Sequence, residues 1–173
     1  MRFPVVAWRF FFVLILCGSS CGSFHAGGTL SPAQYYDQGR YARLDQDWEG
    51  AVCYFEQALH AAERAGDDYY RGYACQQLSA LWTIASEYRK ALDYARSAVS
   101  ALEACGETAG AFLSRLDMAW CHLQLGDPES ARALLPPLRA SGVLSLLDSP
   151  QAARLNHLAS ALGFPLEELV PAH

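Results

Sequence analysis

The chain has 173 residues, of which 52% are hydrophobic and 18% charged. This composition supplies enough apolar surface for one packed domain. It excludes a disordered chain, a collagen-like rod and a small disulfide-stapled scaffold. The formal net charge is −5, from 13 Lys and Arg against 18 Asp and Glu. Nucleic-acid binding needs clustered basic residues that neutralise phosphates, so we expect no nucleic-acid partner.

Residues 1–20 have the pattern of an export signal. Arg2 and Arg9 supply positive charge, and an unbroken apolar run follows over residues 10–17. A membrane-spanning helix needs about 20 apolar residues, so this run is too short to span a bilayer. It has the length typical of the apolar region of a signal peptide.

Small residues lead directly to Cys21, in the order Gly18, Ser19, Ser20. This arrangement resembles the lipobox of bacterial lipoproteins, which implies that Cys21 is lipidated and becomes the new N-terminus. The resemblance implies a membrane-anchored protein of the bacterial envelope that faces the periplasm. No Asp follows Cys21, which favours the outer membrane. Cleavage after Ser20 without lipidation, giving a secreted or periplasmic protein, is the alternative. Residues 21–30 then form the anchor and a flexible tether rich in glycine.

Helix signals dominate from residue 31 onward. Ser31, Pro32 and Gln34 form a capping box with a first-turn proline. Glycines stand where helices should end, at 66, 106, 126 and 163. The pattern predicts helices over 32–45, 48–65, 68–86, 88–105, 109–125, 128–135 and 150–162, with a further short helix over 138–147 and a final turn over 165–170. No stretch alternates long enough between apolar and polar residues to predict a strand.

A period of forty residues runs through these helices. One column of small residues is Gly39, Ser79, Ala119 and Ala159, and a second is Ala51, Ala91 and Ala131. Small side chains allow two helix backbones to approach closely, so we expect these residues where helices cross. Acidic residues recur at 47, 87, 127 and 167. Each is expected to cap the free N–H groups of the helix that it opens.

Together with Trp48 and Tyr88, which follow the acidic residues, these columns resemble the tetratricopeptide repeat (TPR). The resemblance covers about residues 31–170, with a period of about 40 residues where the standard repeat has about 34. It implies an all-α fold for residues 31–173: an α-solenoid of about three long TPR-like hairpins, closed by a C-terminal capping helix. Pro136 and Pro137 depart from the pattern and should end the sixth helix early.

TPR proteins bind an extended peptide or a partner helix in a concave groove lined by the first helix of each hairpin. The groove positions of the family correspond here to Tyr36, Arg40, Arg43, Tyr73, Gln76, Gln77, Thr83, Asp117 and Trp120. Tyr73 and Trp120 fit a core position equally well. Family members that clamp a C-terminal carboxylate carry an Asn where this chain has Asp37, Gln77 and Asp117. The resemblance therefore does not imply that ligand.

The sequence contains no phosphate-binding glycine loop, no His-Glu-x-x-His and no paired Cys-x-x-Cys. We therefore predict no catalytic residue, cofactor or metal site. Cys53, Cys75, Cys105 and Cys121 are predicted to be small buried thiols. Helix rise separates Cys75 from Cys105 by about 9 Å and Cys53 from Cys75 by about 7 Å, too far for a disulfide.

The sequence thus predicts a non-enzymatic scaffold that binds another protein in its groove and a membrane through Cys21. The alternative is an exported, non-lipidated subunit that regulates an enzyme, senses a signal or serves a secretion or pilus assembly complex. Copurification of a stoichiometric enzyme would favour the alternative.

Overall fold

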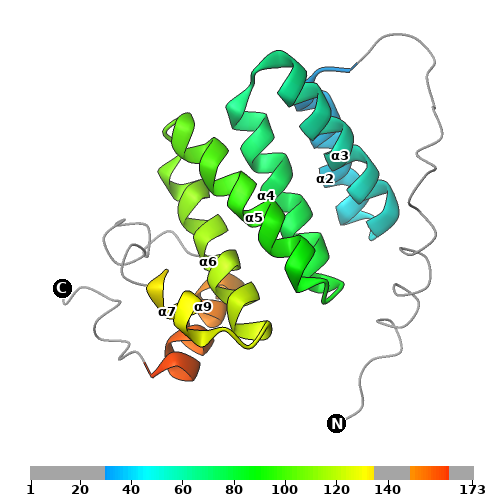
Figure 1. Cartoon of the computed structure of the whole chain (residues 1–173). Coiled ribbons are helices and arrows are strands. Elements are labelled where there is room, and N and C mark those ends of the chain that lie inside the picture. The colour runs from blue at the N-terminus through cyan, green and yellow to red at the C-terminus, as the bar shows by residue number, and fades with distance from the viewer. Residues whose placement is uncertain (1–29, 135–148, 164–173) are drawn as a thin grey trace.

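The computed structural model describes residues 30–134 and 149–163, and these residues form helices joined by short turns (Figure 1). The helices are α2 (Pro32–Leu44), α3 (Trp48–Ala65), α4 (Asp68–Ile84), α5 (Tyr88–Ala104), α6 (Thr108–Gln124), α7 (Pro128–Ala133) and α9 (Ser149–Leu162). The prediction of an all-α chain is confirmed for these ranges, which hold no strand. The expectations for the leader, Cys21, the tether up to residue 29, the Pro136–Pro137 break, 138–147 and 165–170 lie outside them.

Consecutive helices pack in pairs along a row that runs from α2 and α3 at one end to α7 and α9 at the other (Figure 1). Helix α4 also contacts both α2 and α6, and α6 contacts α9. The first helix of each hairpin therefore touches the first helix of the next. Within the two described ranges, no helix is both long and apolar enough to cross a membrane.

The turns between α2 and α7 share one hydrogen-bond pattern. The N–H groups of Asp47, Glu87 and Asp127 each donate to the carbonyl five residues earlier, at 2.8, 2.9 and 2.9 Å. The residue before each of them has a positive φ, as a Schellman motif requires. Glycine fills this place at 66, 106 and 126, as predicted, but Gln46 and Ser86 fill it in the first and third turns with φ of 61° and 62°.

Two of the acidic residues cap their helices as expected. The carboxylates of Asp47 and Asp127 accept hydrogen bonds from the third amide of their helices, at 2.9 and 3.1 Å. Asp67, which lies outside the forty-residue column, caps α4 in the same way at 3.1 Å. Glu87 makes no side-chain capping bond, so the prediction is wrong at this position. Glutamate is one methylene longer than the residues that favour this position, which places its carboxylate beyond the free amides. The capping box of Ser31 and Gln34 is present, with bonds of 2.9 and 3.3 Å.

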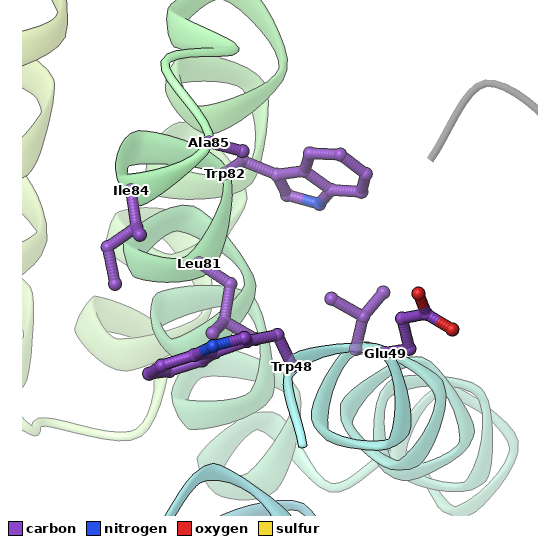
Figure 2. Close-up of a pocket in the computed structure, with 7 residues that line it drawn as sticks. Trp48, Glu49, Leu81, Trp82, Ile84 and Ala85 are labelled. Atoms are coloured by element: carbon purple, nitrogen blue, oxygen red, sulfur yellow. The ribbon is translucent and has the colours of Figure 1, made fainter. Parts of the chain in front are cut away.

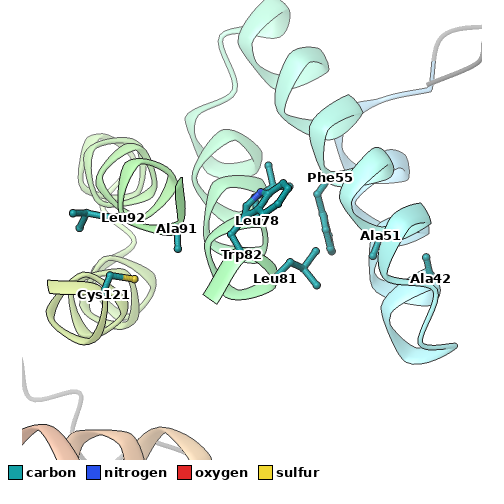
Figure 3. Packing of buried hydrophobic residues seen from close by; sticks show 9 residues of the cluster. All are labelled: Ala42, Ala51, Phe55, Leu78, Leu81, Trp82, Ala91, Leu92 and Cys121. Atoms are coloured by element: carbon teal, nitrogen blue, oxygen red, sulfur yellow. The ribbon is translucent and has the colours of Figure 1, made fainter. Parts of the chain in front are cut away.

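The small residues of both columns lie at close helix contacts. Ala51, Ala91, Ala119, Ala131 and Ala159 have no exposed surface, and Ser79 is 1% exposed. A Cβ atom added to Gly39 would lie 2.7 Å from the ring of Phe55. Figure 3 shows Phe55 and Ala51 of α3 facing Leu78 and Leu81 of α4. The close approach of α2 to α3 therefore depends on the missing side chain at position 39.

The cysteines only partly match the expectation of four buried thiols. Cys75 and Cys121 are buried and free. Cys105 is free but exposed, because it caps the C-terminus of α5 instead of packing within a helix. Cys53 is disulfide-bonded, so the prediction of a thiol there is wrong. The argument from helix rise considered only cysteines 53 to 121, and among Cys75, Cys105 and Cys121 no disulfide forms.

Candidate functional site

Four tyrosines gather between α2 and α4, and two of them were predicted to line the groove. We call Tyr36, Tyr69, Tyr70 and Tyr73 the tyrosine cluster. The ring of Tyr36 lies 5.9 Å from that of Tyr70 and 6.4 Å from that of Tyr73, measured between centroids. Tyr69 lies 5.1 Å from Tyr70 and 4.7 Å from Tyr73. These tilted and edge-on arrangements are the favourable ones for aromatic pairs.

Two hydroxyl groups of the cluster, those of Tyr36 and Tyr73, have a raised pKa. Burial raises the pKa of Tyr36, and the positive charges of Arg40 and Arg43 partly offset this rise. Burial and the negative charge of Glu107 raise the pKa of Tyr73 to about 12. The hydroxyl of Tyr73 donates a hydrogen bond of 3.2 Å to Glu107. The cluster therefore combines aromatic surface with hydroxyl groups that can donate and accept hydrogen bonds.

Part of this region is open to solvent. Tyr69 is 43% exposed, and Arg40 and Arg43 on α2 are exposed. Arg40 lies 3.6 Å from Asp37, and both side chains are 57% exposed, so this ion pair holds the guanidinium only weakly. Gln77 is half-buried, and its side chain lies close enough to Tyr36 to lower the pKa of that hydroxyl. Predicted groove residues of the first two hairpins thus come together with accessible surface.

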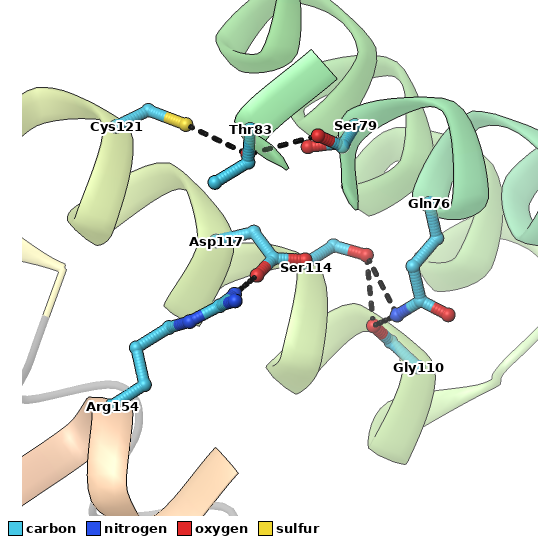
Figure 4. A network of polar contacts seen from close by, with 8 residues as sticks. All are labelled: Gln76, Ser79, Thr83, Gly110, Ser114, Asp117, Cys121 and Arg154. Atoms are coloured by element: carbon cyan, nitrogen blue, oxygen red, sulfur yellow. Dashed lines mark hydrogen bonds and ion pairs between the residues drawn. The ribbon is translucent and has the colours of Figure 1, made fainter. Parts of the chain in front are cut away.

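Two other predicted groove residues join α4 to α6 (Figure 4). The amide of Gln76, which is 9% exposed, donates to the carbonyl of Gly110 at 3.1 Å and to the hydroxyl of Ser114 at 3.2 Å. The hydroxyl of Thr83 donates to the carbonyl of Ser79 at 2.9 Å and lies 3.8 Å from the sulfur of Cys121. Both side chains have their partners within the protein, so we assign them to helix packing.

The last two predicted groove residues lie under α9. Asp117 is 9% exposed and forms an ion pair with Arg154 of α9 (Figure 4). Burial raises the pKa of Asp117 to about 6, although the charge and hydrogen bond of Arg154 oppose the rise. The ring of Trp120 lies 5.4 Å from that of His157, between centroids, and 5.7 Å from the guanidinium carbon of Arg154. The closing helix therefore covers the groove positions of the third hairpin.

Sequence analysis missed half of the tyrosine cluster. Tyr69 and Tyr70 open α4, and Tyr73 follows them at spacings of four and three residues. Side chains at these spacings share one face of a helix. This spacing predicts that the three tyrosines lie together, but the groove positions of the family include only Tyr73 among them.

A pocket, also missed by the sequence analysis, lies between the start of α3 and the end of α4 (Figure 2). It is a shallow hollow of about 20 Å³, lined by Trp48, Glu49, Val52, Leu81, Trp82, Ile84 and Ala85. The Nε1 of Trp82 is buried and has no hydrogen-bond partner within the described part of the chain. The ammonium group of Lys90 lies 3.4 Å from the centroid of the Trp82 ring.

Across residues 30–134 and 149–163, no three His, Cys, Asp or Glu side chains are grouped so that they could hold a metal ion. Comparison of the chain with known protein families, with curated proteins and with solved structures finds no match.

Proposed function

We propose that this chain is a non-enzymatic interaction module built as a TPR-like α-solenoid, which binds another protein through the surface around the tyrosine cluster. The hairpins and their small-residue crossings support the repeat architecture, because helices α2, α4 and α6 contact one another in turn. The closing helix α9 also supports the repeat architecture. The face of α9 toward α6 is apolar, with Leu155, Leu158 and Leu162 buried, and Asn156 and Ser160 point outward. Repeat arrays need such a cap with a polar outer face.

The observation that carries the binding proposal is the pairing of the tyrosine cluster with Arg40 and Arg43. Tyrosine and arginine are enriched at the centres of protein interfaces, because each offers a large contact area together with hydrogen-bonding groups. The rings of the cluster are already ordered by their mutual contacts. A partner therefore loses little side-chain entropy by binding there. Two of the remaining groove residues, Gln76 and Thr83, join α4 to α6.

The proposed location is a bacterial envelope membrane, to which a lipid on Cys21 would anchor the domain. The apolar leader and the small residues before Cys21 support this part of the proposal. The intact mass of the mature protein tests it: lipidation adds the mass of a diacylglyceryl group to a chain that begins at Cys21. A mature chain without that addition would leave the alternative of export without lipidation.

The binding surface is tested by capturing the partner with matched variants of the full chain. Tyr69→Ser combined with Arg43→Ser alters the proposed surface. Tyr41→Ser combined with Arg64→Ser removes the same residue types from exposed positions outside the cluster. We expect the first pair to lower recovery of the partner by about tenfold or more, and the control pair to leave it unchanged. Equal recovery with both pairs would contradict the assignment.

A further inference from the structure

The charged residues around the tyrosine cluster differ between its α4 side and its α2 side. On the α4 side, the carboxylates of Asp68 and Glu107 already have partners within the protein. Asp68 lies 2.7 Å from the guanidinium group of Arg71, and Glu107 accepts a hydrogen bond of 3.2 Å from the hydroxyl of Tyr73. These negative charges are therefore balanced without a group from outside.

The α2 side carries positive charge that the protein itself balances only weakly. Arg40 and Arg43 follow Tyr36 by four and seven residues, so the three side chains share one face of α2. Arg43 is exposed and forms no ion pair with any residue that the structure describes. Arg40 has only its exposed pair with Asp37, at 3.6 Å. Both guanidinium groups are thus accessible to an anion from a partner.

The hydroxyl of Tyr36 shows how these groups act on a nearby oxygen. Burial raises the pKa of Tyr36. The positive charges of Arg40 and Arg43 and the side chain of Gln77 oppose this rise. A group that lowers the pKa of a phenol stabilises negative charge on its oxygen. The same groups therefore attract an anionic oxygen that is placed beside this hydroxyl, and the hydroxyl can donate to it.

We propose that the partner segment bound at the tyrosine cluster is acidic: a side-chain carboxylate within that segment binds the guanidinium groups of Arg40 and Arg43 and the hydroxyl of Tyr36. The neighbouring residue of the segment is aromatic and packs on Tyr69, which is 43% exposed. The whole chain has a net charge of −5, so this positive face is a local exception that selects an anionic partner. The inference rests on the function proposed above and names the chemistry of its partner.

The expected contact has a defined strength and salt dependence. Hydrogen bonds between a guanidinium group and a carboxylate are about twice as strong as those between neutral groups. Because Arg40 and Arg43 are exposed, salt screens their charges. Affinity for an acidic segment should therefore fall as the salt concentration rises, whereas affinity for a neutral segment of the same shape should not.

The test uses nuclear magnetic resonance of the full chain with a minimal probe, acetyl-Glu-Phe-amide, whose amide removes the terminal carboxylate. We expect saturable shifts of the side-chain N–H signals of Arg40 and Arg43 and of the ring signals of Tyr69. Acetyl-Gln-Phe-amide, which has the same shape without the charge, should bind about tenfold more weakly. Acetyl-Glu-Ala-amide, which lacks the ring, should bind about threefold more weakly.

Charge reversal gives the sharpest comparison. Arg40→Glu combined with Arg43→Glu should bind acetyl-Lys-Phe-amide about tenfold more tightly than acetyl-Glu-Phe-amide, the opposite of the wild-type preference. Arg89→Glu combined with Arg96→Glu is the matched control, because it changes the net charge equally at exposed positions of α5. This control should keep the wild-type preference.

Three results would overturn the inference: no saturable shift with any of the peptides, equal affinity for the glutamate and glutamine peptides, or an unchanged preference after charge reversal at Arg40 and Arg43. Equal affinity with shifts at Tyr69 would show a peptide surface that does not select charge, so the proposed function would stand while this inference fails. The proposed function itself is tested separately, by partner capture with the Tyr69→Ser and Arg43→Ser variant.

Discussion

The two ends of the row formed by α2, α4, α6 and α9 are joined by different chemistry. At the α2–α4 contact, tyrosine rings meet one another and keep part of their surface exposed. At the α6–α9 contact, an ion pair joins the buried carboxylate of Asp117 to Arg154, whose side chain is 35% exposed. The first contact leaves a surface that a partner can reach, and the second closes the row.

One column of the repeat shows how this difference arises. Asp37, Gln77 and Asp117 are forty residues apart and occupy equivalent places. Asp37 is exposed, Gln77 is half-buried and Asp117 is buried. The repeat position places each residue at the same point of the first helix of its hairpin. The neighbour that packs there, or the lack of one, determines whether that side chain can meet a partner.

Replacing the arginine of each Asp–Arg pair tests this comparison and has the largest expected effect on stability. Arg154→Ala leaves the buried carboxylate of Asp117 without its partner, so we expect the free energy of unfolding to fall by about 2–3 kcal/mol. Arg40→Ala breaks the exposed pair with Asp37 and should cost about 0.5 kcal/mol or less. Urea denaturation of the two variants measures both values. Equal losses would show that the two ends of the row do not differ as described.

The pH dependence of stability tests the burial of Asp117. Burial raises the pKa of this carboxyl to about 6, above its value in the unfolded chain. Folding then favours the protonated form, so Asp117 should stabilise the fold increasingly as the pH falls through 6. Relative to Asp117→Asn, the wild-type chain should gain about 1 kcal/mol of stability between pH 7 and pH 5. A change of the opposite sign would mean that the charge of Arg154 outweighs burial.

Substitutions in the turns at the two ends of the row are expected to change the stability of the chain least. Gln46 and Gly126 occupy equivalent turn positions, with φ of 61° and 78°. A side chain is strained in this left-handed region, whereas glycine is not. Gln46→Gly should therefore stabilise the chain by about 0.5–1 kcal/mol, and Gly126→Gln should destabilise it by a similar amount. Thermal unfolding of both variants checks the prediction, which fails if Gln46→Gly lowers the midpoint.

The helices could be predicted from the sequence because their signals are local. Caps such as Ser31 and Asp47 and the end glycines each act over a few residues, and they placed most helix boundaries within one or two residues. Glu87 failed as a cap because the pattern of acidic residues did not distinguish it from aspartate.

The candidate sites depend on contacts that the sequence pattern does not contain. The family positions named Asp117 and Trp120 as groove residues, but the place where α9 docks decides that both are covered. The Trp82 pocket likewise arises from the way the end of α4 meets the start of α3. Such contacts between distant elements set exposure, and a repeat register alone does not predict them.

The central claim is that the small residues spaced forty apart allow the hairpins to pack closely, and Gly39 tests it most directly. In an open helix, Gly→Ala is stabilising by about 1 kcal/mol. At position 39 the added Cβ would lie 2.7 Å from the buried ring of Phe55. We therefore predict that Gly39→Ala destabilises the wild-type chain by about 1 kcal/mol or more and becomes neutral or stabilising in a Phe55→Val background. Stabilisation of the wild-type chain by Gly39→Ala, or the same cost in both backgrounds, would contradict the account.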